Sequence, residues 1–354
     1  MLWIEYELPE TVETNEQLQR LHPEWNMEET YRRTGVRQRP IARLGESALD
    51  LALRACGALF ENSGWPPSEV DGVIFCTQSA DHVMPPNSTL LHHRLGLRPS
   101  AAAFDITLAC SGYVYCLALA KALIESGQMD TVLVVTADTY SKYIGPNDRA
   151  CRSLFGDGAA ATLIGVGEPA VGPISLGTDG GGSGCFKLGR ACRDTDAGPY
   201  TAPRPDSGFI AMHGLAVFGL VKQIIPSFVA GLLRDAGRSA ADIDLFVFHQ
   251  ASKLALDSIA DGLGTSPEKM FRNLETRGNL VSASIPVALR DAWNAERLKR
   301  GNLALLVGFG VGFSWGGSFL QVTGNFMKPA GAQAGQKEHC DSTNNGSKLV
   351  PLFS

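Results

Sequence analysis

Cys110 occupies the position at which an apolar helix is expected to begin. In the stretch DITLACSGYVYCLALAKAL, residues 105–123, apolar or small residues recur at helical spacing from Tyr113 onward. A helix N-terminus carries unpaired N–H groups and a positive partial charge, and both favour a thiolate over a thiol. Gly112 leaves space in which a substrate can approach the sulfur. These residue types predict a nucleophilic cysteine, although a small buried cysteine at the start of a core helix would give the same pattern.

Three further segments hold groups that could complete such a site. His249 ends the apolar run IDLFVFH, and ligands of α/β proteins collect at the carboxyl ends of strands. Asn279 comes just before a predicted helix, where it could equally serve as a capping or turn residue. The run GFGVGFSWGG, residues 308–317, follows the last buried strand and could direct backbone N–H groups at a developing oxyanion. Each segment alone also has a purely structural explanation.

The composition is that of an ordinary globular protein. The chain has 354 residues, of which 44% are hydrophobic and 19% are charged. A net charge of −5 gives no reason to expect nucleic acid or an anionic membrane as a partner. We expect no transmembrane helix and no signal peptide. The eight cysteines are scattered without a CxxC motif or metal spacing, so we expect no metal site and a reducing, cytoplasmic location.

An internal repeat organises the elements that must position these groups. Helix-like and strand-like segments alternate, which indicates an α/β fold with buried sheets. SGWPPSEVDGVIFCTQSA, from Ser63, matches AGRSAADIDLFVFHQAS, from Ala236. The 29 residues from Cys110 similarly match the 29 residues from Ser282, each giving a helix, a polar turn and a buried strand. Two matching pairs in the same order indicate a duplication, and a site is then expected where the halves meet.

The repeat divides the chain into two halves and a tail. We expect an N-terminal half at residues 1–170 that carries the cysteine, and a C-terminal half at residues 171–327 that carries the histidine and the asparagine. The stretch 175–208 is rich in Gly, Pro and Asp and is predicted to form loops. Residues 328–354 are polar and poorly patterned, which predicts a disordered tail.

Together the motifs resemble the β-ketoacyl-acyl carrier protein synthase III family. DITLACSGY, FVFHQAS, GNLVSASIP and GFGVGFSWGG occur in that family's order, together with RRTGVRQRPIA at residues 32–42 and LFGDGAAA at residues 154–161. The resemblance extends from Leu8 to Gln321. It implies a thiolase-like α/β fold of αβαβα layers, in which two similar halves are related by a pseudo-twofold axis. It also implies a homodimer.

The resemblance implies a mechanism as well. Cys110 would take an acyl group from acyl-CoA, while the N–H groups of Cys110 and Val311 bind the oxyanion. His249 and Asn279 would then bind the carbonyl of a malonyl thioester, carried by CoA or by an acyl carrier protein, as carbon dioxide leaves. With its ordinary pKa of about 6.5, His249 would be a largely neutral donor at pH 7. The resulting carbanion attacks the acyl group in a Claisen condensation, without a metal or redox cofactor.

Other positions match the family's substrate-binding residues or depart from them. Arg33 and Arg149 match basic residues beside CoA, and Met84 matches a residue that the partner subunit inserts into the acyl pocket. Ser252 replaces the asparagine that usually follows His-Gln-Ala, and Leu254 stands where a basic docking residue for a carrier protein is expected.

These departures keep two alternatives open. The first is a related acyltransferase that passes the acyl group from Cys110 to an alcohol or amine without decarboxylation. The second is a non-catalytic partner subunit. The presence of both His249 and Asn279 favours the condensing enzyme, because simple acyl transfer does not need a pair of donors for decarboxylation.

Overall fold

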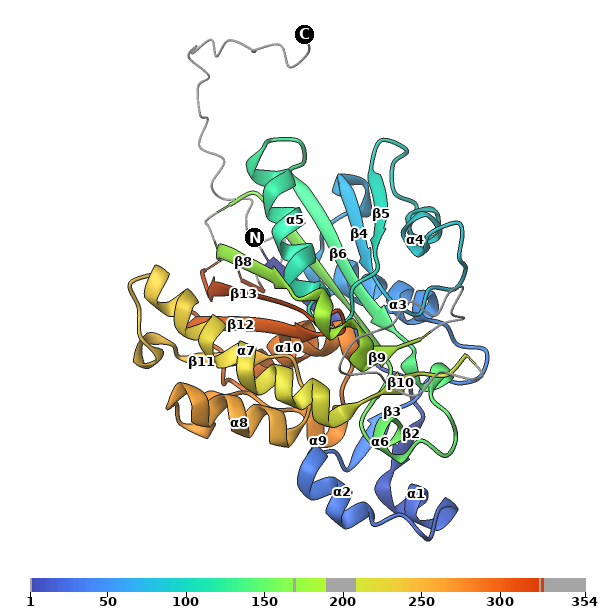
Figure 1. The fold of residues 1–354 in the computed structure, drawn as a ribbon. Coiled ribbons are helices and arrows are strands. Elements are labelled where there is room, and N and C mark those ends of the chain that lie inside the picture. The colour runs from blue at the N-terminus through green and yellow to red at the C-terminus, as the bar shows by residue number, and fades with distance from the viewer. Residues whose placement is uncertain (1, 168–169, 189–207, 325, 328–354) are drawn as a thin grey trace, which may run out of the picture.

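Two β-sheets form the centre of the fold (Figure 1). The computed structural model describes residues 2–167, 170–188, 208–324 and 326–327. The first sheet has the strand order β1-β7-β6-β4-β5, and the second has the order β11-β12-β13-β8. Their strands are β1 (Leu2–Glu7), β4 (Gly72–Cys76), β5 (Ala102–Ile106), β6 (Thr131–Asp138), β7 (Gly158–Gly165), β8 (Val171–Thr178), β11 (Leu245–Phe248), β12 (Leu303–Gly310) and β13 (Ser314–Gln321).

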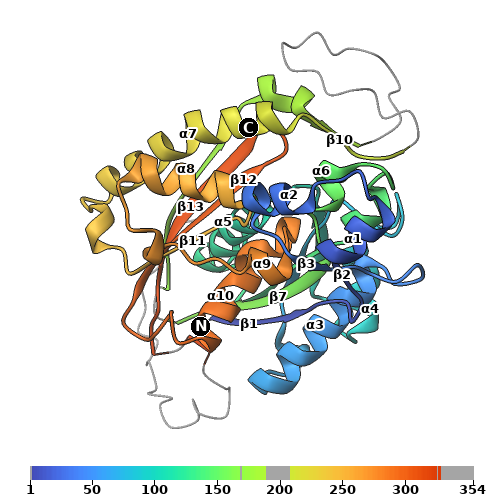
Figure 2. The ribbon, with the colours of Figure 1, turned by 90° about the horizontal axis from the view of Figure 1, so that it is seen from below.

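Helices lie outside and between the sheets, which produces five layers. Figure 2 shows these layers from α7 and α8 on one outer face to α3 on the other. The two inner helices, α5 and α10, each contact both sheets. The longer helices are α3 (Ala48–Ser63), α4 (Asn87–Arg94), α5 (Gly112–Glu125), α7 (Gly214–Asp235), α8 (Lys253–Leu263) and α10 (Ser284–Asn294). This arrangement confirms the predicted αβαβα fold.

Shorter elements surround the layers. The short α-helices and strands are α1 (Asn15–Leu21), α2 (Met27–Thr34), α6 (Arg149–Arg152), α9 (Leu274–Arg277), β2 (Val12–Thr14), β3 (Gln38–Pro40), β9 (Phe186–Lys187) and β10 (Ala211–Met212). The 3-10 helices are η1 (Pro67–Glu69), η2 (Tyr140–Tyr143), η3 (Gly180–Cys185), η4 (Ala240–Asp242), η5 (Pro267–Lys269) and η6 (Val281–Ala283).

The two sheets repeat the same local topology. In the first sheet β4 is parallel to β6, and β6 and β1 are both antiparallel to β7. In the second sheet β11 is parallel to β12, and β12 and β8 are both antiparallel to β13. The helices α3 and α7, which precede β4 and β11, are each followed by a glycine of positive φ, Gly64 at 67° and Gly237 at 63°. The duplicated pattern in the sequence therefore corresponds to a duplicated fold.

The boundaries of the halves, 1–170 and 171–327, stay a prediction, and the predicted tail at 328–354 lies outside the described residues. Loops were expected at 175–208, but β8 extends to Thr178, η3 covers Gly180–Cys185, and β9 follows. Residues 189–207 of that stretch are also outside the described part of the chain.

Helix α7 is the one helix among the described residues that is long and apolar enough, by length and composition, to cross a membrane. In the fold it lies over the second sheet and beside α8 (Figure 2). Its buried positions include Val221, Ile225 and Val229, which recur at helical spacing. The apolar character of this face is accounted for by its packing in the outer layer.

Candidate active site

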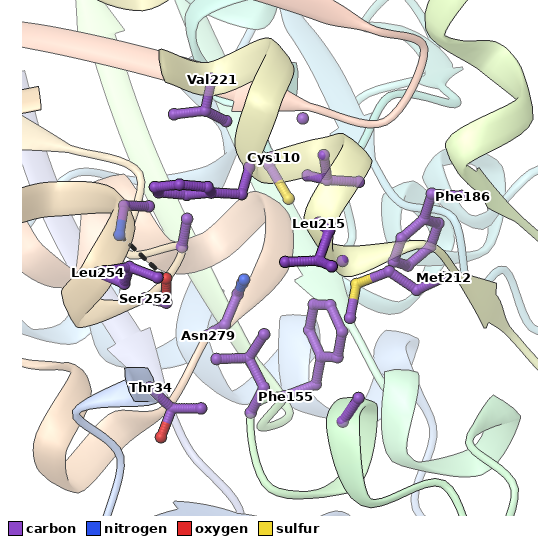
Figure 3. Close-up of a pocket in the computed structure, with 18 of the residues that line it drawn as sticks. Thr34, Cys110, Phe155, Phe186, Met212, Leu215, Val221, Ser252, Leu254 and Asn279 are labelled. Carbon is purple, nitrogen blue, oxygen red and sulfur yellow. Dashed lines mark hydrogen bonds between the residues drawn. The ribbon is translucent and has the colours of Figure 1, made fainter. Parts of the chain in front are cut away.

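A cavity of about 510 Å³ lies where the two halves meet. Cys110 comes from the first half, whereas His249, Asn279 and Val311 come from the second, and all four line the cavity. Figure 3 shows Cys110 and Asn279 among the side chains that line this cavity. The structure thus brings together the four residues that the motifs assigned to chemistry.

Cys110 lies two residues before the first residue of α5 and is packed against the last strand pair. Cys110 is only 7% exposed. A Cβ atom on Gly310 would lie 2.7 Å from the Cys110 Cβ and 3.1 Å from its sulfur, so only glycine leaves room for the cysteine there. Gly112 has a different role from the one expected, because a Cβ there would lie 2.3 Å from the Cys76 sulfur. That glycine permits close packing of α5 on β4 rather than access for a substrate.

The resting protonation state of Cys110 differs from the sequence-based expectation. Burial raises the pKa of the Cys110 thiol far above its usual value, and the negative charge of Asp138 raises it further. A backbone hydrogen bond at the start of α5 lowers the pKa, but by less than burial raises it. Burial thus outweighs the preference for a thiolate that a helix start alone would give, and it favours the thiol form of Cys110 near neutral pH.

His249 follows β11 directly and is held in a nearly closed environment. Its backbone N–H donates to Val307 O at 2.8 Å, and its ring packs edge-on against Phe309 at 5.5 Å between centroids. Burial lowers the pKa of His249 to about 3, so the ordinary value assumed from sequence does not apply. The imidazole is therefore neutral across the physiological pH range.

Asn279 is fixed by its backbone and by its own side chain. Its N–H donates to Leu154 O at 2.9 Å, and its carbonyl accepts from Gly156 N–H at 3.0 Å. The side-chain Oδ1 accepts from Val281 N–H at 2.9 Å, which identifies Nδ2 as the amide atom that lies 3.4 Å from His249 Nε2. Asn279 thus combines the turn role considered from sequence with a side chain that reaches the cavity.

The glycine-rich run forms the tight turn between β12 and β13. Val311 is the first residue of that turn and packs in the same cluster as Cys110. A Cβ on Gly308 would lie 2.9 Å from the Cys110 carbonyl oxygen, so the end of β12 sits directly against the cysteine. The glycines of this run serve close packing beside the nucleophile.

The predicted binding residues lie around the cavity, with one exception. Arg33 on α2 and Arg149 on α6 line its outer part, and Arg33 forms an ion pair with Glu29 at 2.8 Å. Ser252 caps α8, because its hydroxyl accepts from the Ala255 N–H at 3.2 Å (Figure 3). Met84 is 79% exposed and is not among the residues that line the cavity in a single chain.

Several apolar lining residues were missed by the sequence analysis. They come from α6 and its following turn, from the β9–β10 pair and from the start of α7, and include Phe155, Phe186, Met212 and Leu215 (Figure 3). Phe186 lies in the stretch 175–208 that the sequence described only as loops, and Met212 lies four residues beyond the end of that stretch. Met212 pairs with Phe186 between two strands of only two residues each, which are too short to show a periodic pattern in the sequence. No sequence signal therefore pointed to these two residues.

Comparison with known proteins identifies the family. Residues 104–180 match the family model described as 3-Oxoacyl-[acyl-carrier-protein (ACP)] synthase III. Residues 233–322 match the model described as 3-Oxoacyl-[acyl-carrier-protein (ACP)] synthase III C terminal. Beta-ketoacyl-[acyl-carrier-protein] synthase III 3 of Streptomyces coelicolor is 35% identical, over 88% of this chain and 94% of that protein.

Solved structures agree with the family models. A 3-oxoacyl-(acyl-carrier-protein) synthase III crystal structure is similar at a TM-score of 0.84 with 39% identity, covering 90% of this chain and 98% of the other. The corresponding enzyme of Pseudomonas aeruginosa PAO1 gives a TM-score of 0.82 with 34% identity, covering 90% and 96%. The chain therefore belongs to the 3-oxoacyl-[acyl-carrier-protein] synthase III family and is a condensing acyltransferase.

Proposed function

We propose that this enzyme loads an acyl group on Cys110 and then condenses it with a malonyl thioester at His249 and Asn279. The observation that carries the proposal is the meeting of these three side chains in one cavity between the halves. Their residue types match the two half-reactions, since a cysteine sulfur forms and releases thioesters and two neutral N–H donors stabilise an enolate.

In the loading step the Cys110 sulfur attacks the carbonyl carbon of an acyl thioester. The N–H groups of Cys110 and Val311 bind the tetrahedral oxyanion, and the donor's thiol departs. Because Cys110 rests as a thiol, its proton must move during the attack. The proton that Cys110 loses is taken up by the departing thiolate of the donor, so the acyl transfer leaves no net change in protonation.

In the condensation step His249 and Asn279 act as paired donors. Their side-chain nitrogens are 3.4 Å apart, so one carbonyl oxygen can lie within hydrogen-bond distance of both. Carbon dioxide leaves the malonyl thioester, the carbanion attacks the acyl carbonyl, and the Cys110 sulfur departs as a thiolate that is then reprotonated. This pairing favours condensation over plain acyl transfer to an alcohol or amine, in which the Asn279 amide has no comparable task.

The cavity supports acyl-CoA as the donor. Arg33 and Arg149 lie at its outer part, where they can meet the charged groups of CoA, and apolar side chains such as Phe186 and Met212 surround the space available to an acyl chain. The malonyl group arrives on CoA or on an acyl carrier protein. Leu254, 47% exposed at the cavity, gives a carrier protein an apolar contact rather than the basic one expected for the family.

Assembly and location complete the proposal. We assign the enzyme to the cytoplasm as a homodimer, in which Met84 of one copy contributes to the acyl pocket of the other. Its exposed position on the single chain supports this assignment. The enzyme needs no resident cofactor for the two steps, because both substrates are activated as thioesters.

The test separates the two half-reactions. Wild type should release labelled carbon dioxide from malonyl-CoA or a malonyl-carrier protein once Cys110 is acylated. Asn279→Ala should keep loading within a few-fold of wild type and lose on the order of a hundredfold in carbon dioxide release, as expected for one lost donor. Intact-mass spectrometry follows acyl-Cys110 in the same samples. A wild type that loads but releases no carbon dioxide, while an alcohol or amine removes the acyl group, would overturn the condensation step.

A further inference from the structure

Asp138 carries a fully buried carboxylate that has no direct part in the proposed reaction. It is the last residue of β6 and has no exposed surface. Its Oδ1 accepts hydrogen bonds from three donors in the segment 77–79, at distances of 2.9 to 3.3 Å. Its Oδ2 accepts from the backbone N–H of Ser282 at 3.3 Å and from the Ser282 hydroxyl. One carboxylate thus joins the first half to the turn that begins at Asn279.

That turn has a backbone conformation that requires outside support. Val281 has a φ of 53°, in the left-handed region that a β-branched residue rarely adopts. Its N–H donates to the Asn279 Oδ1 at 2.9 Å and thereby directs Nδ2 of the same amide toward His249. A change in the Val281 peptide would therefore rotate the Asn279 amide away from its present direction.

Only a carboxylate fits the donors around Asp138. An ionised carboxylate accepts at both oxygens and donates nothing, whereas an amide would direct its NH2 group at one set of N–H and O–H donors. Burial raises the pKa of Asp138 to about 6, and the hydrogen bonds from Ser282, Gln78 and Ser79 oppose that rise. The ionisable neighbours that sense its charge are Cys76, Cys110, Tyr140 and Tyr143. The negative charge of Asp138 thus stays buried near the Cys110 thiol, and it disfavours ionisation of that thiol.

We propose that Asp138 is a positioning residue for Asn279. Asp138 holds Ser282 in place, and Ser282 stabilises the left-handed peptide at Val281. The Val281 N–H then sets the direction of the Asn279 amide. This inference rests on the donor role of Asn279 in the proposed function, although the link between Asp138 and the amide can be measured without catalysis.

The experiment compares two serines that bind opposite oxygens of the same carboxylate. Ser282→Ala removes a donor on the side of the turn, and Ser79→Ala removes one on the side of β4. Asp138→Asn tests the charge, and Ser282→Thr keeps the hydroxyl. Protein labelled with 15N-asparagine gives the side-chain amide signal of Asn279, which is identified by its absence in Asn279→Ala. Carbon dioxide release and acyl loading are measured on the same variants.

We expect the Asn279 amide signal to shift in Asp138→Asn and Ser282→Ala, and to stay at its wild-type position in Ser79→Ala and Ser282→Thr. Carbon dioxide release should fall at least about tenfold in the first two variants, in kcat rather than KM for malonyl-CoA, with loading within about threefold of wild type. An unmoved signal in Ser282→Ala, or equal losses in both half-reactions, would overturn the proposal. Absence of carbon dioxide release by wild type would refute the proposed function, while the amide signal would still decide the positioning role.

Discussion

The hydroxyl oxygens of Ser111 and Ser314 lie 2.7 Å apart across the boundary between the two halves. Ser111 follows Cys110 in the chain, and Ser314 ends the turn that begins at Val311. The Ser314 hydroxyl also lies 3.1 Å from the Val311 carbonyl oxygen, to which it donates. Ser111 must then donate to Ser314, because each hydroxyl has a single proton. This chain of two hydrogen bonds ties the residue after Cys110 to the turn at Val311, next to the peptides that supply the proposed oxyanion donors.

Removal of either hydroxyl should slow acyl loading. We expect Ser111→Ala and Ser314→Ala each to reduce the loading rate of Cys110 by roughly tenfold, since a donor moved out of place loses part of the hundredfold effect of a missing one. Ser314→Thr should restore most of the rate. Time courses by intact-mass spectrometry measure it, and Ser318→Ala, a buried serine farther along β13, is the control. Unchanged loading in both alanine variants would contradict the role assigned to the pair.

The thiol character of Cys110 can be measured by alkylation. Because burial raises the pKa of this thiol, the thiolate fraction should rise about tenfold per pH unit with no plateau up to pH 9. The rate of iodoacetamide modification in wild type, less that in Cys110→Ala, reports this fraction. A short acyl-CoA should add one acyl mass to wild type, sensitive to hydroxylamine, and none to Cys110→Ala. A plateau below pH 8 would show instead that the start of α5 governs the pKa.

The lowered pKa of His249 has a consequence for stability. Since the unfolded histidine has a pKa of about 6.5 and the folded one about 3, the unfolded state binds more protons between these values. The stabilising contribution of the neutral ring is therefore complete above pH 6.5 and is lost as the pH falls through the range toward 3. Between pH 7.5 and 5.5, wild type should lose about 1.4 kcal/mol more of its free energy of unfolding than His249→Gln. Urea unfolding of both proteins checks this, and parallel losses would contradict it.

Met84 provides the test of assembly. Its side chain is 79% exposed on the single chain, and a residue that enters a neighbouring pocket must be available in this way. We expect a dimer by light scattering at micromolar concentration, and a weakened dimer with altered preference for acyl chain length in Met84→Glu. Val166→Glu, which adds the same charge at another exposed apolar residue, should change neither property. A wild-type protein that is monomeric throughout this range would contradict the prediction.

The sequence was most informative where a residue ended a regular element. His249 follows a buried strand, and Cys110 precedes a helix, so periodicity alone located them at edges where sites form. The link between Asp138 and Ser282 could not be predicted in this way, because the residues are 144 positions apart and neither belongs to a recurring pattern. The protonation state of Cys110 was also inaccessible, since it depends on how much solvent the folded cavity excludes.

Gly310 gives the most direct test of the space around the nucleophile. In Gly310→Ala the new Cβ would lie 2.7 Å from the Cβ of Cys110, so the cysteine must move or β12 must shift. We expect acyl loading to fall by at least tenfold and the alkylation rate of Cys110 to change with it, because the sulfur leaves its place beside Val311. Gly57→Ala is the control, as a Cβ at that exposed helical position of α3 meets no atom within 4 Å and should stabilise the helix slightly. If Gly310→Ala loads at the wild-type rate, the close contact with β12 does not set the position of the cysteine, and the turn at Val311 alone must account for the oxyanion geometry.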